Sequence, residues 1–355
     1  MTTNSVYIHI PFCSSICSYC DFCKLFYIKK WIKPYLESLK KEIQSKYKGD
    51  IIETIYIGGG TPSCLDINEL EELFNIIKIF NKNLKEFTFE CNIEDINIKL
   101  LELLKKNSVN RLSIGLESTS KKNLDYLGRK YNNDFKEKIN LACKYFDNIN
   151  VDLMYALKTM SLKDLENDLD FLIDMGIKHI STYSLIIEEH TKLMNENYID
   201  QDLDRKMYDL ICNKLKKYNH YEVSNFCLKG YESKHNLVYW NNNRYYGFGL
   251  SASGFIDDIR YDNNRNILEY INGKYLKKYE KIDEFTNMQN EMILGLRKLE
   301  GVSKKRFYLK YGKKIEDVFY IKDLIESKKL IDNGEYIYIN KDYIYLSNEI
   351  LINFI

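Results

Sequence analysis

The sequence predicts an α/β protein built round a parallel sheet, followed by a small C-terminal helical domain that carries a β-wing. Strand and helix patterns alternate six times between residues 5 and 185, as in the βαβ units that form parallel sheets. The predicted strands are continuously apolar, which indicates burial on both faces. We therefore expect helices outside the sheet and ligands at the carboxyl ends of its strands.

The six strands are predicted from short apolar runs that end in polar or glycine-rich residues. They cover residues 5–10, 54–57, 86–90, 111–116, 150–155 and 179–185. The first strand runs through Pro11 and Phe12 into a segment rich in cysteine. We expect that segment to be a loop at a strand end.

The helices between these strands are predicted from apolar residues at helical spacing and from capping residues. In the first, Tyr35, Leu36, Leu39 and Ile43 share a face, with Pro34 in the first turn. Asp66 and Glu69 form a capping box, and Phe135, Ile139 and Cys143 point inward from a later helix. The predicted helices cover residues 33–46, a segment beginning at 66, and 97–106, 133–146, 161–175 and 201–218.

Past the last of these helices the pattern changes. Residues 221–255 break into short pieces rich in aromatic residues, Asn and Gly. A helix is predicted over 285–298, and residues 334–346 alternate as a hairpin does. We expect a core domain at 1–220, an irregular aromatic and Gly-rich region at 221–280, and a C-terminal helical domain with a β-wing at 281–355.

Composition narrows the class of function. Charged residues make up 29% of the chain and nearly cancel, at net +1, so there is no polybasic surface for nucleic acid. No apolar run approaches the roughly 20 residues that span a bilayer. We expect a cytoplasmic protein with no nucleic-acid partner.

Four cysteines lie within eleven positions, at Cys13, Cys17, Cys20 and Cys23. The first three, spaced C-x3-C-x2-C, let one loop present thiolates to three corners of an iron–sulfur cluster. A zinc site is an alternative, but no second C-x2-C pair follows. A disulfide framework and scattered structural cysteines are weaker alternatives, because the chain has nine cysteines, an odd number, and these four are clustered.

Two further motifs fall at predicted strand ends. Gly58-Gly59-Gly60-Thr61-Pro62 follows the second strand, where glycines let the backbone approach a ligand closely. A tight turn between strand and helix is the alternative. Glu90 ends the third strand, where its carboxylate can accept from an ammonium group or can simply be solvated.

The spacing of Cys13, Cys17 and Cys20, with Tyr19 before the last cysteine, resembles the signature of the radical S-adenosylmethionine (SAM) superfamily. The resemblance implies a partial (β/α)6 barrel and a [4Fe–4S] cluster whose fourth iron is open to SAM. Cys23 is then a bystander or a fourth ligand. By the same resemblance, the SAM site comprises Tyr7, Tyr19, Gly59, Gly60, Thr61, Glu90, Glu117, Arg129 and Asp152.

Within that family pattern the chain departs at two places. Glu117 stands where relatives commonly have Gln, which turns a neutral amide into a potential anion. Ala156-Leu157-Lys158 stands where relatives tend to carry Gly-Leu-Pro, so the turn after the fifth strand lacks two residues that shape the backbone.

The motif His235-Asn-x-x-Tyr239-Trp240 and the run 246–252, Tyr-Gly-Phe-Gly-Leu-Ser-Ala, resemble the haem chaperone HemW family over nearly the whole chain. The resemblance implies haem bound at His235, Tyr239 and Trp240 and delivered to an acceptor protein, with peripheral membrane association left open. A core role for His235 and Trp240 is the alternative.

Two other functions compete with this one. The first is an oxygen-independent coproporphyrinogen III oxidase, but those relatives end the cysteine motif in C-x-C, whereas Asp21 and Phe22 separate Cys20 from Cys23 here. The second is a plain electron-transfer protein, which leaves the glycine motif and Arg129 without a role. The sequence therefore favours a haem chaperone without oxidase activity.

Overall fold

The computed structural model describes residues 3–80, 84–130, 133–196 and 200–355. Within these residues a nine-stranded sheet forms the centre of the molecule, open at its two edge strands. In spatial order its strands are β11 (Tyr246–Phe248), β1 (Ser5–Ile10), β4 (Thr54–Gly59), β5 (Glu86–Asn92), β6 (Arg111–Glu117), β7 (Asn148–Tyr155), β8 (His179–Ser184), β10 (Asn225–Cys227) and β9 (Asn219–Glu222).

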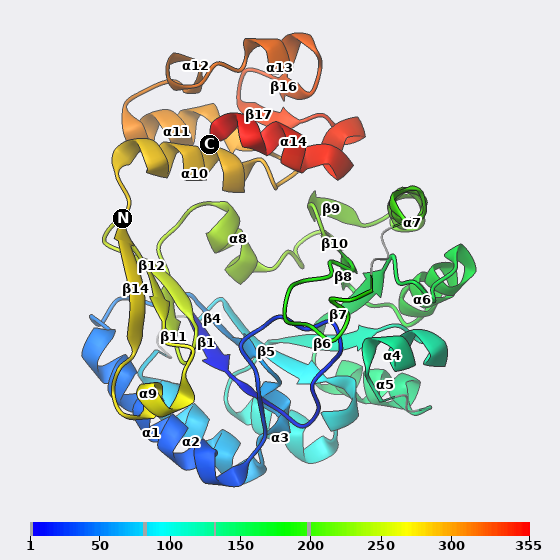
Figure 1. The fold of residues 1–355 in the computed structure, drawn as a ribbon, viewed down its shortest axis with the longest axis vertical. Coiled ribbons are helices and arrows are strands. Elements are labelled where there is room, and N and C mark those ends of the chain that lie inside the picture. The colour runs from blue at the N-terminus through cyan, green and yellow to red at the C-terminus, as the bar shows by residue number, and fades with distance from the viewer. Residues whose placement is uncertain (1–2, 81–83, 131–132, 197–199) are drawn as a thin grey trace.

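The six predicted strands pair in parallel and in chain order, which confirms the α/β fold class. Their apolar residues are buried on both faces, as the continuous runs predict. Helices cover the outer side of the curved sheet (Figure 1). They are α1 (Lys29–Lys46), α2 (Ile67–Ile77), α3 (Ile98–Lys106), α4 (Lys121–Leu127), α5 (Phe135–Tyr145), α6 (Leu162–Asp174) and α7 (Gln201–Lys214).

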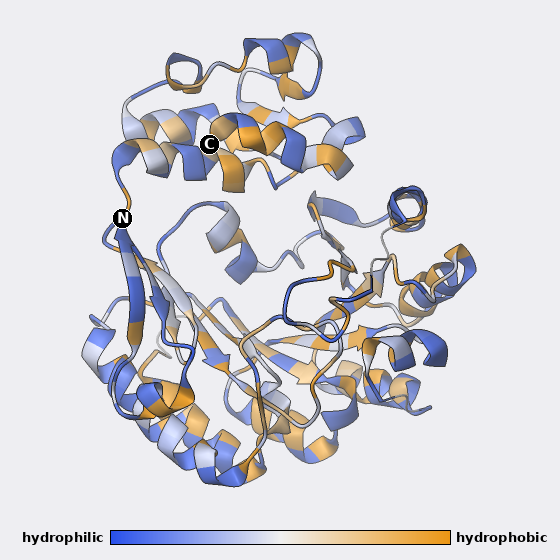
Figure 2. Ribbon diagram, in the orientation of Figure 1, coloured by the Kyte–Doolittle hydropathy of each residue, from blue (hydrophilic) through white to orange (hydrophobic). Residues whose placement is uncertain are grey.

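Apolar residues gather on the strands and on the helix faces turned toward them (Figure 2). The capping box at Asp66 is present as predicted. Two details differ from the prediction. Helix α1 begins at Lys29, so Pro34 lies in its second turn, and Cys143 is exposed because α5 buries Ile139 and Ala142 instead.

Residues 221–280 are more regular than expected. Strands β11 and β10 from this region join the main sheet, β11 in parallel with β1 and β10 antiparallel to β8, so the sheet crosses the division expected near residue 220. The region also forms α8 (Lys234–Trp240), α9 (Ile267–Ile271) and an antiparallel sheet of β12 (Ser253–Ile256), β13 (Ile259–Asn263) and β14 (Leu276–Lys281). Strand β11 was concealed because it is short and contains glycine, and because its pairing partner β1 lies far away in the sequence.

The C-terminal part is helical and carries a small antiparallel sheet in the order β15-β17-β16. The predicted hairpin over 334–346 is wrong in its second half. Residues Lys341–Leu346 form a 3-10 helix, because the Asn340 side chain caps it at the Asp342 N–H. The elements are α10 (Glu284–Gly295), β15 (Val302–Ser303), α11 (Lys304–Tyr311), α12 (Ile315–Val318), α13 (Lys322–Glu326), β16 (Leu330–Asp332), β17 (Tyr336–Ile339) and α14 (Ser347–Leu351).

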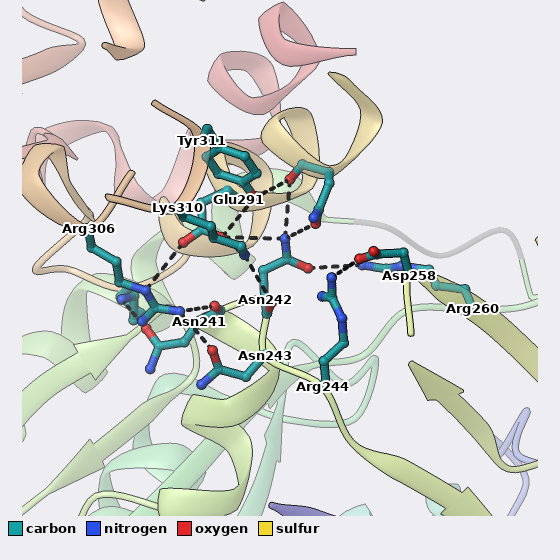
Figure 3. A network of polar contacts seen from close by, with 12 residues as sticks. Asn241, Asn242, Asn243, Arg244, Asp258, Arg260, Glu291, Arg306, Lys310 and Tyr311 are labelled. Atoms are coloured by element: carbon teal, nitrogen blue, oxygen red, sulfur yellow. Dashed lines mark hydrogen bonds and ion pairs between the residues drawn. The ribbon is translucent and has the colours of Figure 1, made fainter. Parts of the chain in front are cut away.

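A polar network joins this part to the segment that follows α8 (Figure 3). Arg306 on α11 donates to Asn243 Oδ1 at 2.9 Å, and Lys310 donates to the Asn242 carbonyl oxygen at 3.3 Å. Lys310 also pairs with Glu291 on α10, and both side chains are buried. Because these groups are removed from water, losing one partner would leave a buried charge. The network therefore fixes the end of α8 against α10 and α11.

In the described residues, no helix combines the length and the apolar character needed to cross a membrane.

The turn after β7 provides a test of local strain. Ala156 occupies the left-handed region at φ +59°, where a Cβ atom costs about 1–2 kcal/mol. Glycine at this position removes that cost but loses about 0.5–1 kcal/mol of entropy on folding. We expect Ala156→Gly to raise the free energy of unfolding by about 0.5–1 kcal/mol in urea titrations.

The matched control is Ala142→Gly, because Ala142 is buried within α5 and has ordinary helical geometry. That variant should lose about 1 kcal/mol. A loss of stability in both variants would show that the turn is not strained.

Candidate functional site

The cysteine loop leaves the carboxyl end of β1 and is closed by its own backbone pairing. Two short parallel strands, β2 (Phe12–Cys13) and β3 (Leu25–Phe26), align Cys13 with Phe26. The Tyr27 N–H donates to the Cys13 carbonyl oxygen at 2.8 Å. The loop is drawn in dark blue in Figure 1 and stands at the strand ends where the sequence placed it.

The glycine turn after β4 packs directly on this loop. The Gly60 and Thr61 N–H groups donate to the carbonyl oxygens of Ile10 and Phe12, each at 2.8 Å. A Cβ atom on Gly60 would lie 2.8 Å from the Phe12 oxygen and 2.9 Å from Cys13 Sγ. Glycine is therefore needed because neighbouring protein atoms come this close.

A second turn holds the loop from the other side. Gly128 ends α4 with φ +70°, and a Cβ there would lie 2.5 Å from Ser18 Oγ. The Ser18 N–H donates to the Leu127 carbonyl oxygen at 2.8 Å. The Leu-Gly-Arg motif thus contacts the cysteine loop through its first two residues and presents Arg129 to the site.

Cys13, Cys17 and Cys20 line one cavity of about 150 Å³, whereas Cys23 lines a neighbouring cavity. Burial raises the pKa of each of the three thiols, that of Cys13 to about 11. No three His, Cys, Asp or Glu side chains of the described ranges converge as a single metal ion requires. Three thiols spread round one cavity suit a cluster in which each binds a different iron.

Glu90 lies at the end of β5 in the same cavity. Tyr56 donates its hydroxyl to Oε1 at 2.6 Å, and the Gly59 N–H donates to Oε2 at 3.0 Å. Burial raises the pKa of Glu90 to about 7, although both hydrogen bonds favour the anion. An ammonium group in the cavity would stabilise the carboxylate further.

Arg129 and Glu117 line the same cavity and form a buried ion pair at 3.1 Å. Arg129 also donates to Asn92 Oδ1 at 3.2 Å and to the Gly115 carbonyl oxygen at 2.9 Å. Burial raises the pKa of Glu117 to about 7, and Arg129 opposes that rise. Glu117 therefore competes for the guanidinium with any carboxylate ligand.

Asp152 on β7 completes the acidic part of the cavity. It accepts from the Asn150 side-chain amide at 2.8 Å and lies 3.5 Å from the Ser113 hydroxyl. Burial raises the pKa of Asp152. Asp152 lines the cavity, and its role as a hydroxyl acceptor for a ligand stays a prediction.

The structure brings the three cysteines together with eight of the nine residues expected to bind SAM. These eight are Tyr19, Gly59, Gly60, Thr61, Glu90, Glu117, Arg129 and Asp152. Tyr7 lines the neighbouring cavity instead, where its hydroxyl contacts His9 Nδ1 at 2.9 Å. Its contact with SAM stays a prediction.

Three residues that hold the charged groups of the site were not predicted from the sequence. Tyr56 bonds Glu90, Asn92 bonds Arg129, and Ser113 approaches Asp152. Tyr56 and Ser113 lie within strands whose apolar runs predict burial, so no local pattern marked Tyr56 as the partner of Glu90 or Ser113 as a residue that lines the cavity. Asn92, two residues after Glu90 at a strand end, carried a usable signal.

The three residues expected to bind haem occupy different environments. His235 is fully buried, and both ring nitrogens are bonded, Nδ1 to Thr54 Oγ1 at 2.9 Å and Nε2 to Tyr239 at 2.7 Å. Arg297 lies over the Trp240 ring at 5.1 Å. Tyr239 lines a cavity, the one shared with Cys23 and Tyr7. In this arrangement His235 has the core position that the sequence left as the alternative.

Comparison with known proteins agrees with this geometry. The family model for the radical SAM superfamily matches residues 7–172, and the model of the HemN C-terminal domain matches residues 283–342. The solved structure of the coproporphyrinogen III oxidase HemN from Escherichia coli superposes over 99% of this chain and 90% of its own, with a TM-score of 0.87 and 18% identity. Fold and site define a radical SAM protein, whose cofactors are a [4Fe–4S] cluster and SAM.

Within that class the sequence relatives are more specific. The heme chaperone HemW of Lactococcus lactis is 37% identical over 99% of this chain and 97% of its own length. HemW of Bacillus subtilis is 37% identical over 98% of this chain and 97% of its own. The chain belongs to the HemW family.

The cluster should depend on Cys13, Cys17 and Cys20 and not on Cys23, because Cys23 lines the other cavity. The four single Ala variants would be reconstituted anaerobically, and their iron content and visible absorption measured. We expect loss of the cluster in three variants and full retention in Cys23→Ala. Loss of the cluster in Cys23→Ala would defeat the assignment.

Glu117→Gln should strengthen SAM binding by freeing Arg129. In the native protein Glu117 ionises as the pH rises through about 7 and takes up the guanidinium. The pKa of Glu90 is also about 7, and ionisation of Glu90 should strengthen SAM binding, since its anion favours the SAM ammonium group. Glu90 is present in both the native protein and the variant, so its effect on affinity is the same in both. The affinity ratio of variant to native protein should therefore isolate Glu117.

We expect that ratio to be near one at about pH 6 and to approach tenfold at about pH 8, since a charge-assisted contact contributes about 1.5–3 kcal/mol. Calorimetry on the reconstituted proteins measures it. A ratio independent of pH would mean that Glu117 does not compete for Arg129.

Proposed function

We propose that this protein is a haem chaperone that binds haem and delivers it to an acceptor protein. The observation that carries the proposal is the similarity to proteins named heme chaperone HemW, which extends over essentially the whole chain. That similarity includes the region beyond the cysteine cavity, where a cargo site distinct from the SAM site would lie. The proposal of a haem chaperone is therefore supported by sequence similarity outside the residues common to all radical SAM proteins.

The cysteine cavity would hold the cofactors. Cys13, Cys17 and Cys20 would ligate the cluster, which supplies an iron site for the methionine part of SAM. Glu90 and Arg129 carry opposite charges and would bind the ammonium and carboxylate groups of that part. Because Arg129 is already paired with Glu117, SAM must displace a buried ion pair to bind.

The alternative, a coproporphyrinogen III oxidase, has less support. The structural likeness to HemN is at 18% identity and concerns the fold alone. Cys23 gives the oxidase alternative no support either, because it lies outside the cysteine cavity.

We propose that delivery occurs in the cytoplasm, with peripheral contact to a membrane where the acceptor is membrane-bound.

The proposal predicts that haem loaded at one equivalent stays bound through gel filtration and then passes to an apoprotein. Apomyoglobin serves as the acceptor, and transfer is followed by its absorption spectrum. In parallel, the reconstituted protein is incubated anaerobically with coproporphyrinogen III and SAM, with no protoporphyrinogen IX expected. Failure to retain haem, or robust production of protoporphyrinogen IX, would reject the proposal.

A further inference from the structure

A second cavity, of about 670 Å³, lies beside the cysteine loop and is walled partly by residues of the β12–β14 sheet. Its volume falls within the range of about 300–1,000 Å³ that is usual for small-molecule and cofactor sites. Phe22 lines both cavities, so the two adjoin at the cysteine loop. The SAM site described above makes no use of this second space.

The lining of this cavity suits a flat ligand with acidic groups at one edge. Its aromatic walls come from Tyr7, Phe22, Tyr239 and Tyr245, which can cover an apolar ring system. Arg265, Lys277 and Lys278 are exposed and line it too, so they can pair with carboxylates while remaining partly in water. Two acids, Asp21 and Asp262, leave the cavity lining with an excess of positive charge.

Hydrogen bonds fix the direction of the Tyr239 hydroxyl. Thr54 donates its hydroxyl to Ser5 Oγ at 2.9 Å, so Thr54 Oγ1 must accept the Nδ1–H of His235. Nε2 of His235 then carries the lone pair and accepts the hydroxyl of Tyr239 at 2.7 Å. The phenol proton points into the core, and the remaining lone pair on its oxygen is available to a ligand.

Burial keeps this arrangement in place. Burial, with a smaller contribution from Arg111, lowers the pKa of His235 to about 3, so in the haem-free protein the imidazole is neutral and Nε2 is an acceptor. The His235 main-chain N–H donates to Glu86 at 2.9 Å, which fixes the start of α8. His235 could ligate an iron through Nε2 only by giving up its hydrogen bond with Tyr239, at the cost of a buried unsatisfied group.

Tyr7 forms a similar pair with His9, whose Nε2–H donates to the Cys23 carbonyl oxygen at 2.8 Å. Tyr7 packs toward the SAM side, with its ring 6.1 Å from Tyr56, which in turn bonds Glu90. Tyr239 instead packs at 4.6 Å against Tyr245, another wall of the second cavity. Tyr239 is therefore the better placed of the two phenols.

We propose that the second cavity is the haem site, with the Tyr239 oxygen as the iron(III) ligand and His235 as its positioning residue. The inference deepens the proposed function and rests on it. As the Tyr239 oxygen bonded the ferric iron, its O–H bond would break and the proton would pass to His235 Nε2, so a phenolate would ligate the iron and no electron would be transferred. Tyrosine is an established axial ligand for ferric haem. Arg265, Lys277 and Lys278 would bind the propionates.

The test is a titration of the full chain, with its cluster reconstituted, with ferric haem. Resonance Raman difference spectra against the haem-free protein detect bands of an iron-bound phenolate. We expect these bands in the native protein and their loss in Tyr239→Phe, with affinity lower by roughly tenfold. Tyr245→Phe is the matched control, because it removes a phenol from the same wall without touching the pair with His235.

Two further arms separate iron contact from cavity shape. Metal-free protoporphyrin IX should bind the native protein and Tyr239→Phe with equal affinity. It should bind the triple variant Arg265→Ala/Lys277→Ala/Lys278→Ala more weakly. His235→Ala should shift the phenolate bands, and His235→Gln, which keeps an acceptor, should restore them in part. Circular dichroism and the cluster spectrum check the folding of each variant.

The outcomes for the function and for the site can be told apart. A native protein that binds no haem rejects the proposed function. Haem bound by the native protein without phenolate bands, or with bands that survive Tyr239→Phe, overturns the site and leaves the function standing. Loss of the bands in Tyr7→Phe but not in Tyr239→Phe would move the ligand to Tyr7.

Discussion

The close approach of the Gly60 backbone to Cys13 is the contact on which the rest of the site depends. A side chain at Gly60 would overlap both the Phe12 carbonyl oxygen and the Cys13 sulfur. Because Gly60 has no side chain, the turn after β4 comes close enough to form two backbone hydrogen bonds with the end of β1 and the loop that follows it. Adjacent parallel strands thus bring the glycine turn and the cysteine loop together at one edge, and Gly128 closes the loop from α4.

A second constraint is the balance of buried charge in the cysteine cavity. Glu90, Glu117 and Asp152 all face it, and Arg129 is paired with one of them. Burial raises the pKa of each carboxyl group, so the cavity avoids several adjacent anions near neutral pH. Glu117 takes part in this balance twice, as a third acidic group and as the partner of Arg129. An ionised Glu117 reduces the access of a ligand carboxylate to Arg129.

Local patterns predicted the core well. The six strands, the cap at Asp66 and the strand-end positions of Gly59, Gly60 and Glu90 follow from spacing within short windows, and all are present. Errors arose where local patterns competed with distant partners. The segment Lys341–Leu346 alternates like a strand but forms a 3-10 helix, and β11 joins the main sheet although its own sequence is glycine-rich and short.

The sequence by itself determined the α/β class, the three clustered cysteines and the motifs that gather round them, because these depend on residues close together in the chain. Only the tertiary structure decided which side chains face which cavity. His235 is bonded to Thr54, 181 positions away, and this bond turns the imidazole into the core and leaves Tyr239 at the cavity wall. Cys23 lies two residues before β3 and lines the second cavity, apart from the three other cysteines of the loop. Such contacts join segments that fold together only when the sheet forms, so no local pattern could have specified them.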